Sequence, residues 1–294
     1  MVIEASKKAA SLSCWSDPVS VEPIGGGITN SNFLVEHRGK RHFVRIGEDI
    51  PEHGIMRFHE RAASRAAAAA GISPEVLHVE EGAMVLQFIE GRVLESTEFA
   101  RPEMLERIVA LIRRCHLDVP QYLRGPAMMF WVFHVIRDYA HTLRELESSH
   151  VLELSRLIEI GRHLETAIGP ISVVFGHNDL LSANFIDDGD RVWLIDWDYA
   201  GFNSPLFDLG GLASNNEFSD SMELDLLACY FDAPPSEGLL IRYRAMKCAS
   251  LLRESMWSMV SERTSKVDFD FASYTETNLR RFEDAWSRFQ EKRF

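Results

Sequence analysis

The sequence predicts an α+β fold made of two lobes, a small N-terminal lobe built on an antiparallel sheet with one helix and a larger, mostly helical C-terminal lobe. Three observations lead to this expectation. The first ninety or so residues hold short β-rich runs separated by glycine-containing turns. After Gly91 the apolar residues recur with helical spacing. Within the helical part, one polar segment at 176–201 reads GHNDLLSANFIDDGDRVWLIDWDYAG and surrounds two short apolar runs.

The size and composition are those of a globular protein without a membrane span. The chain of 294 residues is long enough for one large domain or two modest lobes with a substantial core. It is 46% hydrophobic and 26% charged. No apolar run reaches the roughly 18 residues that a membrane helix needs. The first fifteen residues lack the apolar core of a signal peptide, so we expect a cytoplasmic protein.

Charge and cysteine content exclude several other classes. The 31 basic and 44 acidic residues give a net charge of −13, which argues against a nucleic-acid partner and favours a cationic or neutral small substrate. Four widely spaced cysteines without a CxxC pair indicate reduced thiols rather than a disulfide framework or a zinc site. They are Cys14, Cys115, Cys229 and Cys248.

Five β-rich runs are expected to form the N-terminal sheet. They lie at 19–24, 32–37, 41–47, 76–80 and 83–91. Gly25-Gly26-Gly27 and Arg38-Gly39-Lys40 separate the first three runs, which should form an antiparallel meander, and Glu81-Gly82 turns the last two into a hairpin. The alanine-rich run at 56–70 predicts the helix of this lobe, and Gly71 ends it.

The remainder of the chain predicts helices around two short strands. Helical spacing is found at 102–116, 128–146 and 152–168, followed by the β-rich runs SVVFGH and VWLIDW and by further helices. We place the boundary in the neck near residues 88–95. This gives a nucleotide-binding lobe of residues 1–91 and a helical lobe of residues 92–294 that carries a catalytic loop and a substrate pocket. A small sheet lobe, a neck and a helical lobe with one polar hairpin is a kinase-like plan.

The polar segment contains the groups that phosphoryl transfer to an alcohol requires. Such a reaction needs a carboxylate to orient the hydroxyl and accept its proton, and oxygen ligands to hold Mg²⁺ on the phosphates. Asn184 follows Asp179 by five residues, and Asp196 comes after the next β-rich run, which we expect to be the partner strand of FGH. Protein kinases place their base, metal-binding Asn and metal-binding Asp in this order. We therefore expect the three side chains to converge at one end of a hairpin.

An ordinary polar turn is the alternative explanation. Asp187-Asp188-Gly189-Asp190 has turn composition, and short motif matches produce many false positives. The complete ordered set within a two-lobed plan favours the phosphotransfer site. We expect His177 to order the loop backbone, and Asp198 to be either a further metal ligand or an anchor of the loop.

The segments HNDLLSANF and LIDWDYAGFNSPLFDLG resemble the choline/ethanolamine kinase family, within the wider group that includes aminoglycoside phosphotransferases. The bacterial, LicA-like branch is the most similar. The resemblance extends from PIGGGITNSNF to the C-terminal helices. It implies ATP-dependent phosphorylation of a small amino alcohol, choline or ethanolamine, with Asp179 as the base and Asn184 and Asp196 as Mg²⁺ ligands. Asp208, in FDLG, matches a family aspartate that supports the loop.

The glycine-rich turn and the neck are the expected nucleotide contacts. Glycines at a strand-turn-strand let backbone N–H groups approach phosphate, although an ordinary hairpin tip has the same composition. The turn is neither a P-loop nor a dinucleotide fingerprint. In LQFIEG, which resembles the family neck, the backbone would bind the adenine edge. The resulting contacts are Gly26, Gly27, Thr29, Asn30, Ser31, Gln87, Phe88 and Ile89.

Arg45 in HFVRIG stands where a protein kinase carries lysine. Its guanidinium supplies charge and forked donors to a phosphate, and the choline kinase family is similar in using arginine here. Glu60, in the alanine-rich helix, is expected to pair with Arg45 and hold it. The alternative for Glu60 is an exposed helix pair with Arg57 or Arg61.

The acceptor pocket would need aromatic faces and carboxylates if the substrate is a quaternary ammonium. LLRESMWSMVSERTS resembles the family segment with two tryptophans three apart; Trp257 matches the second, and Glu254 replaces the first. Tyr274 is the nearest match to a cage tyrosine, and Asn215, Asn216 and Glu217 lie where the family has an acidic substrate contact, within two residues of register. The alternative for Trp257 is core packing. Glu254 leaves ethanolamine or another cationic alcohol open.

Three rival functions remain at this point. A related kinase could act on an aminoglycoside, thiamine or another small hydroxyl compound, because fold does not decide substrate. A nucleotide-binding pseudokinase would be marked by loss of Asp179, Asn184 or Asp196, and all three are present. A metal-dependent hydrolase would need more histidine ligands. The sequence leaves a homodimer open.

Overall fold

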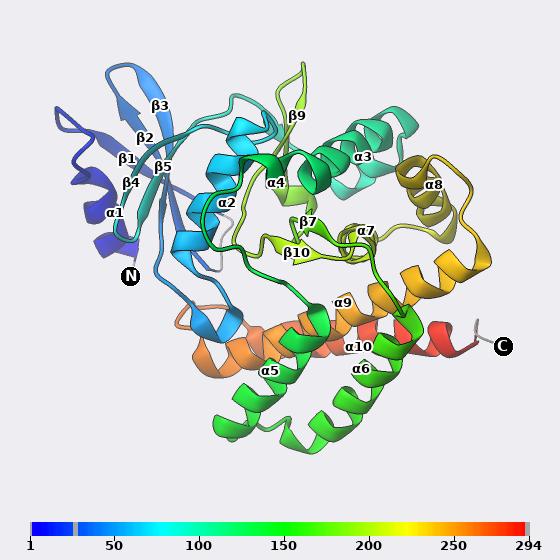
Figure 1. Cartoon of the computed structure of the whole chain (residues 1–294). Helices are drawn as coiled ribbons and strands as arrows, with labels where there is room; N and C mark the ends of the chain where they lie inside the picture. Colours follow the sequence, from blue (N-terminus) through cyan, green and yellow to red (C-terminus); the bar gives the residue numbers. More distant parts are fainter. Residues whose placement is uncertain (1, 26–28, 292–294) are drawn as a thin grey trace.

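The computed structural model describes residues 2–25 and 29–291. Its N-terminal part is an antiparallel sheet, and the rest of the chain is mostly helical with two small sheets (Figure 1). This arrangement confirms the predicted α+β class.

The N-terminal sheet has the order β1-β2-β3-β5-β4, and neighbouring strands are antiparallel. The expected meander and the second hairpin are therefore both present. The five strands are β1 (Ser20–Ile24), β2 (Ser31–His37), β3 (Lys40–Ile46), β4 (Val76–Glu80) and β5 (Ala83–Gln87).

Alternation along β3 separates a core residue from a site residue. Val44 is buried with Phe33 in a core that packs against α1 (Val2–Ala10), a helix that we did not predict. Because successive side chains of a strand point to opposite faces, Arg45 lies on the other face of the sheet. There it meets α2 (Arg57–Ala69), which is the predicted helix of this lobe.

Eight α-helices follow in the described C-terminal part. They are α3 (Pro102–Leu117), α4 (Val119–Tyr122), α5 (Val132–Glu145), α6 (Leu154–Ile168), α7 (Pro205–Asn215), α8 (Asp220–Phe231), α9 (Glu237–Thr264) and α10 (Phe271–Glu291). The helix expected over 128–146 begins only at Val132. Before it, the chain is extended beside Phe202, whose N–H donates to the carbonyl of Met128 and whose carbonyl accepts from the N–H of Phe130.

The two strands that frame the polar loop do not pair with each other, so the expected hairpin is wrong. β7 (Val174–Gly176) pairs with β10 (Gly201–Asn203), and β9 (Val192–Leu194) pairs with β8 (Phe185–Asp187). The turn after β8 joins it to β9 at once, so the nearest antiparallel partner of β9 is local. A further short strand, β6 (Arg92–Val93), pairs with β8 and joins the neck to this sheet.

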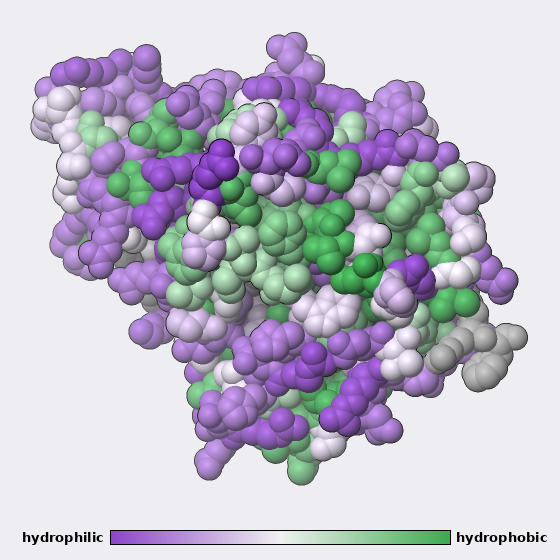
Figure 2. All heavy atoms as spheres, in the orientation of Figure 1, coloured by the Kyte–Doolittle hydropathy of each residue, from purple (hydrophilic) through white to green (hydrophobic). Residues whose placement is uncertain are grey.

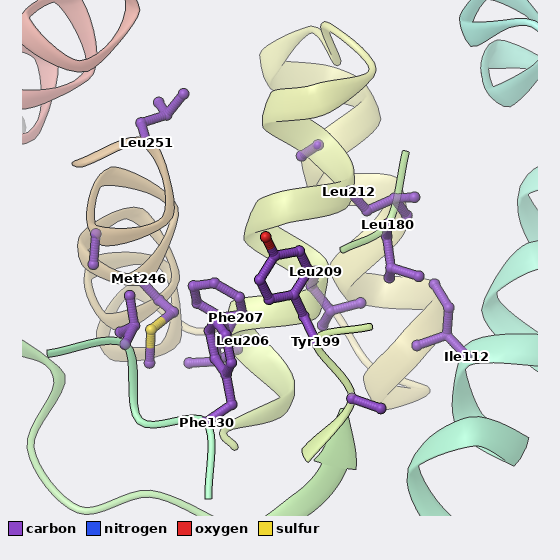
Figure 3. Close-up of a cluster of buried hydrophobic side chains, with 14 of the residues drawn as sticks. Ile112, Phe130, Leu180, Tyr199, Leu206, Phe207, Leu209, Leu212, Met246 and Leu251 are labelled. Carbon is purple, nitrogen blue, oxygen red and sulfur yellow. The ribbon is translucent and has the colours of Figure 1, made fainter. Parts of the chain in front are cut away.

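The large core includes side chains of α7 and α9, and Leu180 of the polar loop belongs to it. Figure 3 shows Phe207 and Tyr199 there, with Phe130 beside them and Leu180 of the loop on the other side of α7. The two helices approach closely because α7 has Gly210 at the crossing. A Cβ on Gly210 would lie 2.9 Å from Cα of Lys247 in α9, so a larger residue would separate the helices.

On the face drawn in Figure 2, hydrophilic side chains cover the N-terminal sheet and the region of α5 and α6, while hydrophobic surface gathers near the middle of the view. In the part of the chain that the structure describes, no helix is both long and apolar enough to cross a membrane. The division into lobes at residues 91 and 92 stays a prediction; the chain passes there from the five-stranded sheet to β6.

Candidate active site

The loop after β7 is held in place by Asp208, which lies in the first turns of α7. Its two carboxylate oxygens accept the backbone N–H groups of His177 and Asn178, at 2.8 and 2.7 Å. Nε2 of His116 lies 2.9 Å from the same carboxylate. Burial alone would raise the pKa of Asp208, but the hydrogen bond and charge of His116 and the backbone N–H groups keep it below its ordinary value. The arrangement is that of a loop support, as the resemblance implied.

Asn178 gives the loop its sharp bend. It has a left-handed backbone with φ of 65°, which asparagine tolerates better than most residues. Its side-chain amide donates to the carbonyls of Tyr199 and Gly201, and its Oδ1 accepts from Asn203. His177 is fully buried, and its Nε2 lies 2.9 Å from the carbonyl oxygen of Ile195. The loop is thereby tied to β10 and to the segment that precedes Asp196.

The three predicted catalytic residues lie in one region of the structure, although the hairpin is a different one: Asn184 contacts the backbone of Asp179, and the charge of Asp196 acts on Asp179. Asn184 donates from Nδ2 to the backbone carbonyl of Asp179 at 2.9 Å, and its own carbonyl accepts from the N–H of Ile195. Asp196 follows immediately, with a left-handed φ of 70°. Burial raises the pKa of Asp179 to about 8, and the charges of Glu254 and Asp196 add to this while Arg253 opposes it. The pairing of β8 with β9 brings Asn184 near Asp196, and the loop after β7 brings Asp179 to Asn184.

Arg45 crosses from the sheet to this group. Its Nη1 donates to Glu60 at 2.7 Å and to Asp196 at 2.8 Å, and lies 3.4 Å from Asp198. The expected contact between Arg45 and Glu60 is therefore present, and both side chains are buried. Arg57 also donates to Glu60, at 2.6 Å, so the alternative partner shares the carboxylate in a buried rather than an exposed pair. Burial alone would raise the pKa of Asp196, but Arg45 lowers it.

Asp198 anchors the end of the glycine-rich segment. One carboxylate oxygen accepts from Thr29 and Asn30, at 3.1 and 2.9 Å, and the other accepts from Arg57 at 2.8 Å. Burial and the nearby negative charges raise the pKa of Asp198 to about 7, against the pull of Arg45 and Arg57. This geometry favours an anchor over a metal ligand.

The structure describes only some of the other predicted nucleotide contacts. Ser31 begins β2 opposite Ile46, and Gly26 and Gly27 lie outside the described residues. In the neck, the N–H of Gln87 already donates to the carbonyl of Glu75 at 2.9 Å. That contact leaves Phe88 and Ile89 as the better candidates for adenine.

A cavity of about 790 Å³ adjoins the Arg45 network on the side of the β4–β5 turn. Arg45 and Glu60 line it together with Lys8 and Gly82, whereas Asp179 does not. This cavity therefore does not connect the Arg45 network with the loop.

The predicted acceptor residues divide into two groups. Trp257 is 5% exposed, donates from its indole N–H to the hydroxyl of Tyr199 at 2.7 Å, and has its ring centroid 6.4 Å from that of Tyr274. Tyr274 in turn donates to Glu254 at 2.9 Å. These three predicted side chains form one cluster. The near-complete burial of Trp257 also agrees with the core-packing alternative.

Asn216 and Glu217 do not join that cluster. Asn216 is buried and donates to the carbonyls of Leu180 and Leu212, so it supports the loop. Glu217 is exposed and lines a surface hollow with residues of α8 and α10. Asn215, which precedes Asn216, lines a small hollow with Asp179 instead. α7 ends at Asn215, and Glu217 has a left-handed φ of 54° beyond the helix, so these neighbouring side chains reach different surfaces.

Several residues of the site were not found from the sequence, among them His116, Asn203 and Arg253. Arg253 is buried in α9; its Nη1 donates to Glu254 at 2.8 Å, and its guanidinium carbon lies 4.4 Å from the ring centroid of Tyr199. A signal did exist, because two charged residues interrupt a helical stretch that is otherwise apolar or small. His116 and Asn203 carry no comparable local signal.

The oxygen groups present suit a magnesium ion that is shared with phosphates. Within the described ranges, no group of three or more His, Cys, Asp or Glu side chains could hold a metal alone. Magnesium usually takes one or two protein oxygens and completes its shell with phosphate and water. The carboxylate of Asp196 is 27% exposed, and the bond from Nδ2 of Asn184 to Asp179 directs its Oδ1 away from that contact. The two side chains therefore fit such an ion.

Known proteins agree with the fold and indicate a family. The family model described as choline/ethanolamine kinase matches residues 21–227. A probable ethanolamine kinase of Arabidopsis thaliana is 26% identical, over 87% of this chain and 76% of that protein. A crystal structure of a choline/ethanolamine kinase family protein from Mesorhizobium loti is 28% identical with a TM-score of 0.78, and 99% of each chain is covered.

More distant structures extend the likeness. The structure of LicA in complex with AMP has a TM-score of 0.75 at 24% identity and covers 98% of both chains. A putative aminoglycoside phosphotransferase from Ralstonia eutropha has a TM-score of 0.64 at 14% identity, over 99% of this chain and 98% of that one. These two show a shared fold. Since the family model covers more than half of the residues, the chain belongs to the choline/ethanolamine kinase family of phosphotransferases.

Proposed function

We propose that this phosphotransferase moves the γ-phosphate of ATP, with Mg²⁺, onto the hydroxyl of a small amino alcohol, choline or ethanolamine. The observation that carries the proposal is the meeting of Asp179, Asn184 and Asp196 beside Arg45. These side chains come from the loop, from the start of β8, from the end of β9 and from the N-terminal sheet. Arg45 is far from the other three residues in the chain, and the four together would supply the groups that phosphoryl transfer requires.

On the nucleotide side, Arg45 is prepared to bind a phosphate. All its bonds to Glu60, Asp196 and Asp198 use Nη1, and among the described residues its buried Nε has no partner. A phosphate oxygen would satisfy such a donor. When bound, Mg²⁺ would neutralise and align the phosphates, held by Asn184 and Asp196.

On the acceptor side, Asp179 is positioned to orient the hydroxyl and to receive its proton. Burial disfavours the ionised carboxylate, which is why its pKa is about 8. A cationic substrate would lower this pKa, because a nearby positive charge favours the ionised form. Binding of an amino alcohol would thus help Asp179 to act as a base.

Between the two alcohols, the pocket favours ethanolamine. Glu254 stands where the family segment has an aromatic residue, and it faces Tyr274. A primary ammonium can donate hydrogen bonds to a carboxylate, whereas a quaternary ammonium relies on aromatic faces and charge alone.

The test is to give the purified protein Mg·ATP with ethanolamine, choline, thiamine or an aminoglycoside, and to measure ADP and the phosphorylated product for each. We expect the largest kcat/KM with ethanolamine or choline, and ethanolamine above choline. ADP formation that depends only on the aminoglycoside or thiamine would contradict the substrate class. ADP formation that no alcohol accelerates would contradict the phosphotransferase itself.

A further inference from the structure

Arg253 is a buried cation beside the proposed base. It is 4% exposed, and its guanidinium carbon lies 4.4 Å from the ring centroid of Tyr199 and 5.7 Å from that of Phe130. Its Nη1 is held by Glu254. Two aromatic faces and one carboxylate therefore fix the plane of the guanidinium, so the directions of its other N–H groups are also fixed.

Those other N–H groups are unused. Among the residues that the structure describes, neither Nε nor Nη2 of Arg253 has a hydrogen-bond partner. The nearest approach is that of the Tyr139 hydroxyl: burial raises its pKa to about 12, and the charge and hydrogen bonding of Arg253 oppose that rise, although the hydroxyl does not complete a hydrogen bond with Nε or Nη2. A buried donor without a partner is costly, and this cost is greatest for charged groups. The arrangement is expected where a ligand atom completes the hydrogen bonding.

A small hollow lies where such an atom would sit. It has a volume of about 10 Å³, which is room for about one water molecule or one substrate oxygen. Arg253, Glu254 and Ser250 line it from α9, and Asp179 and Asn215 line it from the loop and the end of α7. Arg253 and the proposed base Asp179 therefore both line this hollow.

A hydroxyl group matches this hollow better than either charged alternative. A carboxylate would be repelled by Asp179 and Glu254, and an ammonium has no lone pair with which to accept a hydrogen bond from Arg253. A hydroxyl accepts a hydrogen bond from the guanidinium through its oxygen and donates its own proton to the carboxylate. We infer that Arg253 binds the oxygen of the acceptor hydroxyl while Asp179 binds its proton, an assignment that rests on the proposed function.

The step is then balanced at every atom. The hydroxyl oxygen forms a bond to the γ-phosphorus as the bond from that phosphorus to the bridging oxygen breaks, and ADP leaves with the electron pair. The hydroxyl proton moves to Asp179. Arg253 touches the attacking oxygen throughout, which directs a lone pair at the phosphorus and makes Arg253 a catalytic residue.

The test compares each alcohol with its analogue that lacks the hydroxyl. Binding of ethanolamine and ethylamine, or of choline and ethyltrimethylammonium, is measured by calorimetry with the wild type and with Arg253→Met. We expect the hydroxyl to increase affinity on the order of tenfold in the wild type, as a hydrogen bond to a charged group does. In Arg253→Met the difference in affinity between the two ligands should become much smaller, because only the hydrogen bond from the hydroxyl to Asp179 remains. Arg253→Lys should restore part of the difference.

The control variant is Arg263→Met, an exposed change in the same helix. It should keep the wild-type difference, and all variants should bind ATP alike, which shows that they are folded. An equal loss of affinity for both ligands in Arg253→Met would give Arg253 a purely structural role and overturn the inference. Tighter wild-type binding of L-serine than of ethanolamine, lost in Arg253→Met, would also overturn it, because Arg253 would then bind a carboxylate. If these results fail while ethanolamine is still phosphorylated, the proposed function stands; if no alcohol is phosphorylated, it falls on its own.

Discussion

The two sides of the candidate site are built in different ways. The phosphate side joins Arg45 of β3, Glu60 of α2 and Asp196 after β9, three elements far apart in the chain, through charged hydrogen bonds. The acceptor side takes Arg253, Glu254 and Trp257 from consecutive turns of one helix, α9. A network across elements fixes chemistry that must stay the same, whereas the face of a single helix can change its substrate by exchanging one or two residues.

Removal of the proposed base should be the most damaging change on either side. We expect Asp179→Ala to lower kcat by about 10²–10⁴-fold, the usual contribution of a positioned acid or base, while the affinity for ATP stays near that of the wild type. Stopped-flow or coupled-enzyme rates and nucleotide titrations give the two quantities. Wild-type turnover in this variant would remove Asp179 from the chemistry and leave it a structural residue.

The support of the loop should matter for stability as well as for rate. Asp208→Asn removes the charge that holds the N–H groups of His177 and Asn178 and that faces His116. Such a change in a buried, fully used carboxylate is expected to lower the free energy of unfolding by about 2–4 kcal/mol, measured by urea denaturation. Asp190→Asn, in an exposed turn, is the matched control and should change little. Equal stability of the two variants would show that the loop does not depend on Asp208.

The acceptor side should be sensitive to acid. The ring of His53 stacks on that of Trp257, with 4.9 Å between the ring centroids. Burial, with the charge of Arg253, lowers the pKa of His53 to about 3, below its ordinary value of 6.5. The unfolded state takes up the proton at a higher pH than the folded state does. The contribution of neutral His53 to the free energy of unfolding is therefore fully present above pH 6.5 and is lost as the pH falls toward 3. Between pH 7 and pH 5 it amounts to about 2 kcal/mol. Between pH 7 and pH 5, the free energy of unfolding of His53→Gln, measured by urea denaturation, should fall by that much less than that of the wild type. Equal pH dependence in the two proteins would show that His53 is in contact with water.

A substitution of Trp257 should change the affinity for the acceptor without changing the affinity for ATP. Trp257→Phe keeps an aromatic ring but loses the hydrogen bond to Tyr199. We expect acceptor affinity to fall by about 1 kcal/mol and ATP affinity to stay unchanged. Calorimetry with each ligand provides the comparison. If both affinities are unaffected, Trp257 is a core residue and not part of the acceptor pocket.

The sequence predicted the parts of the molecule whose signals are local. Alternating β-rich runs and a glycine-containing turn were enough for the five-stranded sheet, and the spacing of Asp179 and Asn184 was enough for the loop. The pairing of the short strands was predicted wrongly, because β7 has only three residues and finds its partner, β10, after a long intervening segment. Three residues carry too little periodicity to choose a partner.

Residues that act through packing were the hardest to predict. His116 reaches Asp208 only because α3 lies against β7 and the loop, and no local pattern records that contact. Glu217 was expected at the substrate and lies on the surface, because its neighbour Asn216 uses the inward position to support the loop. Arg253 was visible as a charge in a buried helix, but its meaning depends on Tyr199, which comes from another part of the chain.

The most direct test of the proposed phosphoryl transfer follows the γ-phosphate itself. The protein is incubated with Mg²⁺, ethanolamine and ATP labelled in the γ-phosphate, and the label is located in wild type and in Asp196→Asn. The wild type should place the label in phosphoethanolamine, with one labelled phosphate transferred for each ADP formed. Asp196→Asn should transfer the label far more slowly. Label that appears only in inorganic phosphate, or equally fast transfer by Asp196→Asn, would contradict the proposed phosphoryl transfer.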